Sequence, residues 1–133
     1  MTSKVDDQSI GDPDPLWRRI HPTQFVSDGS GSMRASSAAF NNSNDGTGMS
    51  VSLAREAQAA GVTAAMALDH FPTFGLASLT AGVCRGHRQT IERDPTHDDR
   101  HHALVNGEKP KSVRNALTRA AIIVIAPTRV SDQ

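Results

Sequence analysis

The chain has 133 residues with 14 basic and 14 acidic side chains, so its formal net charge at pH 7 is zero. This length suits one ordinary domain, and an apolar share of 37% still allows one core if tails and loops account for the low value. Nucleic-acid-binding domains typically carry a clustered excess of basic residues, which this neutral charge balance does not indicate.

The cysteine count and the apolar runs exclude further classes. Cys84 is the only cysteine, which excludes an intramolecular disulfide and a cysteine-based zinc cluster. No stretch approaches the roughly 20 apolar residues that a membrane-spanning helix needs, and the N-terminus lacks a signal-peptide pattern. We therefore expect a cytoplasmic protein with no membrane partner.

The first residues are acidic and poor in apolar side chains. Residues 1–14 contain four aspartates against one basic residue, Lys4. Such a segment buries too little surface to offset its ordering entropy. We predict a disordered acidic tail over 1–14, a single domain over 15–127 and a flexible C-terminus over 128–133.

The next segments predict a β-hairpin. Pro22 favours an extended backbone at His21, and a short strand is expected at residues 23–26. Residues 28–31 are typical of a turn because their glycines accept positive φ. Residues 33–40 form the second strand candidate, and their small side chains allow close approach of another backbone or a ligand.

The middle of the chain predicts short alternating elements. The stretch 76–85 fits a helix and a strand equally well. The other expected elements are a strand at 49–51, a helix at 53–60 capped by Ser52 and ended by Gly61, a short helix after Thr63, and strands at 88–93 and 102–106.

The last predicted element is an amphipathic helix over about 112–125. Val113, Leu117 and Val124 recur at helical spacing, and Pro127 follows. The predicted fold class is α+β. It consists of a small, mostly antiparallel sheet with this C-terminal helix packed on one face.

Several short patterns resemble those of a group of small bacterial proteins without an assigned activity. The patterns are W-R-R-I-H-P at 17–22, S-S-A-A-F at 36–40, M-S-V at 49–51, D-P at 94–95 and H-A-L-V at 102–105. The resemblance covers roughly residues 16–125 and implies a stand-alone domain. It carries over no catalytic residue.

A first candidate site combines basic and hydroxyl side chains. Arg19 and His21 share a face if their strand is extended, and Ser36 or Ser37 approaches them if the hairpin pairs nearby. Arginine, histidine and serine are donors suited to phosphate, so a nucleotide or NAD is the expected ligand. The pattern is similar to ADP-ribosyltransferase sites, with Glu56 and Glu92 as the remaining candidates for the glutamate. The alternative is that His21-Pro22 is a turn and that the serines pack a tight hairpin.

Histidines supply the second group of candidates. The densest cluster of possible metal ligands comprises His97, Asp98, Asp99, His101 and His102. We interpret it as a solvated loop and expect neither a metal nor a cofactor. His102 opens an apolar strand, where it serves either as a general base or as a side chain satisfied by a backbone carbonyl.

The sequence leaves three classes of function open, and it does not decide whether the chain is an enzyme. The leading hypothesis is an accessory or protein-binding domain, because no complete catalytic set can be assembled. The second is a nucleotide- or NAD-using enzyme, which a polar pocket uniting Arg19 with His102 would favour. The third is an RNA-binding or RNA-cleaving domain, which a flat basic face over 85–93 would favour. The candidate catalytic residues are His21 and His102, and the candidate ligand-binding residues are Arg19, His21, Ser36 and Ser37.

Overall fold

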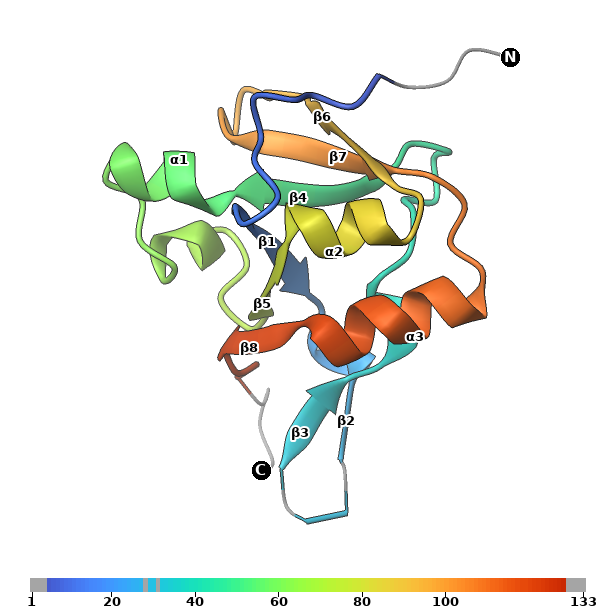
Figure 1. The fold of residues 1–133 in the computed structure, drawn as a ribbon. Coiled ribbons are helices and arrows are strands. Elements are labelled where there is room, and N and C mark those ends of the chain that lie inside the picture. Colours follow the sequence, from blue (N-terminus) through green and yellow to red (C-terminus); the bar gives the residue numbers. More distant parts are fainter. Residues whose placement is uncertain (1–4, 28, 31, 129–133) are drawn as a thin grey trace.

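The computed structural model describes residues 5–27, 29–30 and 32–128 and confirms the predicted α+β fold (Figure 1). Its strands are β1 (Pro15–Ile20), β2 (Phe25–Ser27), β3 (Met33–Ala35), β4 (Met49–Leu53), β5 (Gly75–Thr80), β6 (Thr90–Arg93), β7 (His102–Asn106) and β8 (Ile122–Ile125). Its α-helices are α1 (Ala54–Ala59), α2 (Ala81–Gly86) and α3 (Lys111–Ala120). Short 3₁₀ helices cover Pro22–Gln24, Ser37–Ala39 and Met66–Leu68.

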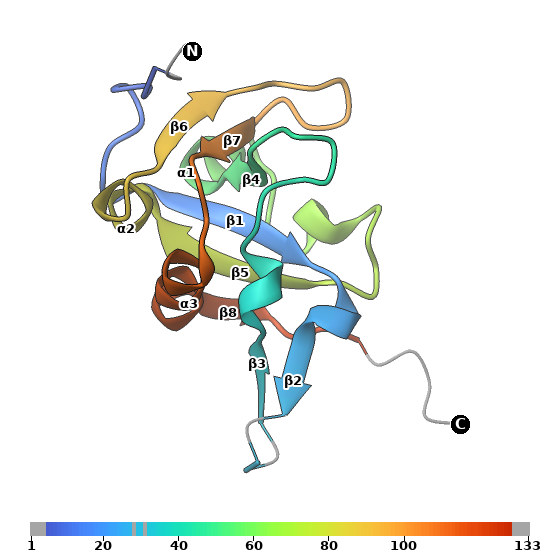
Figure 2. The ribbon, with the colours of Figure 1, turned by 90° about the vertical axis from the view of Figure 1, so that its right-hand side faces the viewer.

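Six strands form one antiparallel sheet in the order β6-β7-β4-β1-β5-β8. Strands β2 and β3 form a separate hairpin that extends away from this sheet (Figures 1 and 2). The hairpin confirms the predicted pairing of two neighbouring strands, and Gly29 has the expected positive φ of +88°, although the second strand ends at Ala35 and a 3₁₀ helix follows.

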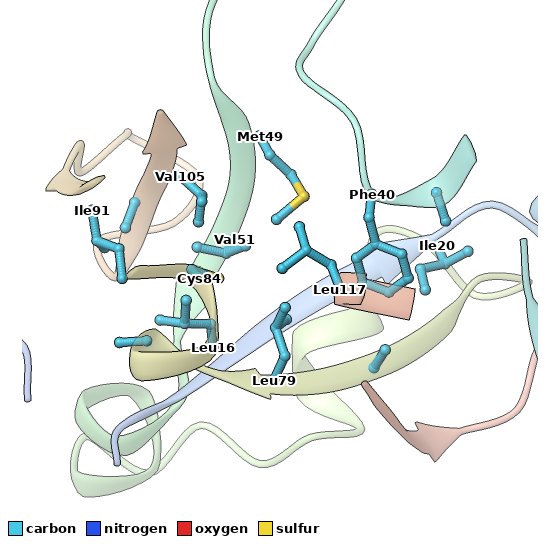
Figure 3. Close-up of a cluster of buried hydrophobic side chains, with 14 of the residues drawn as sticks. Leu16, Ile20, Phe40, Met49, Val51, Leu79, Cys84, Ile91, Val105 and Leu117 are labelled. Atoms are coloured by element: carbon cyan, nitrogen blue, oxygen red, sulfur yellow. The ribbon is translucent and has the colours of Figure 1, made fainter. Parts of the chain in front are cut away.

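The two faces of the sheet pack against different segments, and β1 shows how the sequence sorts them. Leu16 and Ile20 are fully buried on the face covered by α2 and α3, in a core that includes Phe40 and Leu117 (Figure 3). Trp17 lies on the other face, in a smaller cluster with residues of α1 and of the segment that follows it. The alternation of side chains expected of an extended strand is therefore present in β1.

The predicted disordered tail is wrong for residues 5–14. Ile10 is buried in the main core, and the backbone N–H of Gly82 donates to the carbonyl of Asp12 at 2.8 Å. Arg85 binds the carboxylates of Asp6 and Asp12 at 2.8 and 2.7 Å. Composition suggested a solvated segment, but its aspartates have arginine partners on α1, α2 and β6. Residues 1–4 and 129–133 lie outside the described residues.

The predicted C-terminal helix is correct in its first part only. Helix α3 covers Lys111–Ala120 and buries Leu117, as expected, and Pro110 occupies its N-cap position. Residues 122–125 form strand β8, which pairs with β5. Since residues 120–125 are all apolar, any periodicity fits them, and their β-branched side chains favour a strand.

Elements in the middle of the chain follow the prediction with shifted ends. The stretch 76–85, which fits a helix and a strand equally well by sequence, contains one of each, because β5 ends at Thr80 and α2 begins at Ala81. Gly61 has a φ of +89°, as expected for a helix C-terminal glycine. Ser52 belongs to β4 instead of capping α1, and its hydroxyl is used elsewhere.

Candidate functional site

A pocket of about 670 Å³ lies over three neighbouring strands of the sheet. Ser52 of β4 is paired directly with Trp17 of β1 and with His102 of β7. Directly paired residues of antiparallel strands present their side chains on the same face, so these three side chains form a row across the floor. Arg19 also lines the floor, two residues along β1. We call this space the His102 pocket.

Two segments form the walls of the His102 pocket. Residues 96–101 connect β6 to β7 on one side, and residues 62–71, between α1 and β5, lie on the other. The first wall is held down by backbone contacts, because Leu53 N–H donates to the carbonyl of His101 at 2.8 Å. Both walls come from irregular segments on a rigid sheet, which is a common construction for binding sites.

A network around Asp99 joins the floor to one wall. Ser52 Oγ donates to Asp99 Oδ2 at 2.5 Å, and the backbone N–H of His101 donates to Asp99 Oδ1 at 2.9 Å. Arg19 places an Nη atom 3.8 Å from Asp99 Oδ2. It also donates to the carbonyl of Ala67 at 3.1 Å and stacks over the ring of Phe71 at 4.8 Å. Arg19 therefore bridges the two walls. Its burial lowers the pKa of the guanidinium, and Asp99 opposes this shift.

His102 is held through one ring nitrogen. Its Nδ1 lies 2.9 Å from the carbonyl oxygen of Asp94 and 3.1 Å from Asp94 Oδ2. Because both oxygens are acceptors, Nδ1 carries the proton and donates. The Nε2 atom is then the nitrogen left to meet a ligand in the pocket. The structural role expected for His102, satisfaction by a backbone carbonyl, is thus present together with a geometry suited to proton transfer.

The pocket combines charges of both signs with several imidazoles. Its acidic residues are Asp69, Asp98 and Asp99, its basic residues are Arg19 and Arg100, and its histidines are His70, His97, His101 and His102. Within the described residues, no group of three or more histidine, cysteine or acidic side chains is arranged to hold a metal ion.

The four predicted ligand-binding residues are divided by the structure. Arg19 lines the His102 pocket, whereas Ser36 and Ser37 line a different pocket beside α3. His21 lines neither. Its Nδ1 accepts from the backbone N–H of Thr23 at 3.1 Å, and its ring packs edge-on against Phe74. His21 is therefore a cap of the 3₁₀ helix at Pro22–Gln24, which is the turn given as the alternative interpretation.

Two of the three arginines in the 85–93 region, Arg85 and Arg93, are engaged in ion pairs, whereas Arg88 is exposed. Arg85 binds Asp6 and Asp12 as described above. Arg93 makes a two-pronged contact with the carboxylate of Glu56, both bonds at 2.6 Å. These pairs neutralise most of the positive charge that an RNA-binding role would use here.

Cys84 has the buried, unreactive setting expected from the sequence. It is fully buried in the main core, and this burial raises the pKa of its thiol to about 12. A thiol that stays protonated at neutral pH is a poor nucleophile.

Comparison with known proteins gives no further guide to function. No protein-family model, curated protein or solved structure matches this chain. The resemblance to small bacterial proteins stays a prediction. No helix in the part of the chain that the structure describes is long and apolar enough to cross a membrane.

Sequence reasoning named Arg19 and His102 but missed the residues that connect them. Asp99 and His101 were considered only as metal ligands, and Ser52 only as a helix cap. The missing information is the strand order, which places β7 next to β4 and β4 next to β1. The one available signal was the alternation in β1, which places Trp17 and Arg19 on one face.

Proposed function

We propose that this protein binds a small polar molecule with a planar ring, of the nucleoside or nucleotide class, in the His102 pocket. One observation carries the proposal: Arg19 of β1 and His102 of β7 line the same pocket although β4 separates their strands. A volume of about 670 Å³ lies within the range of small-molecule sites.

The lining supplies the contacts that such a ligand uses. The Arg19 guanidinium over Phe71 and the imidazoles of His97 and His101 offer flat surfaces for a ring. Asp98 and Arg100 offer an acceptor and a donor for the polar groups of the ligand.

Calorimetry with adenosine, adenosine monophosphate and NAD tests the proposal, with two-dimensional NMR to locate the site. We expect at least one of the three to bind and to shift the amide signals of residues 96–102 and 67–71. His101→Ala should weaken binding by about 0.5–1.5 kcal/mol, the scale of one hydrogen bond. His87→Ala is the matched control, because His87 is a partly exposed histidine that does not line the pocket.

Two results would contradict this function. One is no binding of any of the three probes in the millimolar range. The other is binding that shifts signals elsewhere and is equally tight in His101→Ala and wild type.

A second candidate function is hydrolysis of the bound ligand, which the Asp94–His102 pair favours. Nε2 of His102 would take a proton from a water molecule as the water oxygen attacks the bound ligand. The protonated imidazole would then pass that proton to the leaving group as its bond to the ligand breaks. Asp94 would stabilise the imidazolium. Chromatography of NAD and nucleotides after incubation tests this, with Asp94→Asn expected to slow product formation at unchanged ligand affinity. Equal rates of product formation by wild type and Asp94→Asn would exclude this role of the Asp94–His102 pair.

The accessory or protein-binding role predicted from the sequence stays a prediction. The exposed apolar side chains of Ile122 and Val124 on β8 are compatible with it. Nothing in the described part of the chain shows what would cover them.

A further inference from the structure

A second pocket, of about 300 Å³, lies between the β2–β3 hairpin and α3. The main polar side chains that line it share one property, because each of them can donate a hydrogen bond. These side chains are Arg34, Ser36, Ser37, Asn115 and Arg119. We call this space the hairpin pocket. It shares no lining residue with the His102 pocket.

Secondary structure brings these donors together from two distant parts of the chain. Arg34 lies in β3, and Ser36 and Ser37 follow where the chain turns into its next 3₁₀ helix. Asn115 and Arg119 are four residues apart on α3, so they share one face of that helix. Helix α3 packs against the 3₁₀ helix Ser37–Ala39, which fixes the two sets of side chains beside each other (Figure 2).

The donors of the hairpin pocket are not used inside the described structure. The ion pairs among described residues involve neither Arg34 nor Arg119. Ser36 makes no capping bond with its side chain. Thr118, in contrast, is a lining residue whose hydroxyl already donates to the carbonyl of Arg114 at 2.7 Å. The described lining residues include no carboxylate.

We propose that the hairpin pocket binds a dianionic phosphate group, free or as the terminal group of a small phosphomonoester. Two guanidinium groups neutralise the two charges, and each presents a planar fork that matches pairs of phosphate oxygens. The serine hydroxyls and the Asn115 amide donate to the remaining lone pairs. The absence of a carboxylate among the described lining residues removes the competitor that occupies Arg19 in the His102 pocket.

The test is calorimetric titration of the full chain with inorganic phosphate and, separately, with glycerol 3-phosphate. We expect binding of at least one probe. Arg34→Ala and Arg119→Ala should each lower the affinity about tenfold or more, the effect of losing a charge-assisted hydrogen bond. Both residues are exposed, so their replacement should leave the thermal midpoint unchanged, which circular dichroism verifies.

Two further variants separate this site from others. Arg34→Lys keeps the charge but loses the fork, so its affinity should lie between those of wild type and Arg34→Ala. Arg100→Ala removes an exposed arginine of the His102 pocket and should bind phosphate as wild type does.

Each pattern of results decides the proposal. Binding of the phosphomonoester alone would show that the pocket also contacts the ester group. Failure of both probes to bind in the millimolar range would overturn the proposal. The proposal would also be overturned if phosphate affinity fell in Arg100→Ala but not in Arg34→Ala or Arg119→Ala. That result would place the phosphate in the His102 pocket and leave the ligand binding proposed for that pocket standing.

Discussion

Lys109 is a buried cation whose hydrogen-bond partners among the described residues are all neutral oxygens. Its Nζ donates to Asn42 Oδ1 at 2.5 Å and to the carbonyls of Val105 and Gly107 at 2.8 and 3.2 Å. These bonds tie the loop before β4 to the turn after β7. Burial is the main cause that lowers the pKa of Lys109 from 10.5 to about 8. The charge therefore destabilises the folded state at neutral pH.

The free energy of unfolding should consequently rise as the pH increases from about 8 towards 10.5. In this window the folded protein has lost the Lys109 proton while the unfolded chain still binds it, so raising the pH favours folding. The expected gain is on the order of 2 kcal/mol. Urea denaturation between pH 8 and 10 measures this gain in the free energy of unfolding. Arg18, whose pKa is lowered to about 10, contributes fully to the pH dependence only above this range.

The measurement uses a Cys84→Ala background. The Cys84 thiol keeps its proton in the folded state to a pKa of about 12 but ionises near 9 when unfolded, so it lowers stability as the pH rises above 9. Lys109→Met in the same background should abolish the rise. An identical pH profile with lysine and methionine at this position would contradict the assignment.

The N-terminal segment before β1 behaves as part of the core, and Ile10 is the residue that anchors it. The side chain is only 2% exposed, so Ile10→Ala should destabilise the protein by about 2–5 kcal/mol through lost burial and a residual cavity. Val5→Ala is the control, because Val5 is 84% exposed and should cost little. Thermal or urea unfolding measures both. Equal, small effects would restore the disordered tail that composition predicts.

The same elements show what the sequence can predict. Where a turn or helix end has strict backbone demands, the prediction holds, as at Gly29 and Gly61, and the strand predicted at 102–106 matches β7. Where every residue is apolar, as at 120–125, periodicity carries no information. The N-terminal segment fails for another reason: its aspartates look solvated until Arg85 and Arg93, some 80 residues away, are brought beside them.

The candidate site depends on strand order, which is a property of the whole molecule. Arg19 and His102 are 83 positions apart in the sequence. They line one pocket because only β4 lies between β1 and β7 in the sheet. Local patterns do not encode that order. The sequence therefore predicts the right residue types for a polar pocket but groups Arg19 with His21, Ser36 and Ser37, which lie elsewhere.

The order of the sheet also determines which strand stays unpaired along one side. Strand β8 pairs with β5 only and forms one edge of the sheet. Its sequence, Ile-Ile-Val-Ile, has no charge, and Ile122 is 69% exposed while Val124 is 44% exposed. Uncharged apolar edge strands promote association between molecules, because the free backbone groups can pair with another strand. A charged residue on such an edge blocks this pairing.

Ile122→Lys should therefore raise the protein concentration at which aggregation begins and leave the free energy of unfolding within about 0.5 kcal/mol of wild type, as for other surface substitutions. Ile123→Lys is the matched control, because Ile123 packs against the main core and a lysine there should destabilise the fold and promote aggregation. Light scattering during a concentration series measures association, and urea unfolding measures stability. If Ile122→Lys aggregates as readily as wild type at equal stability, the β8 edge is not the surface through which molecules of this protein associate.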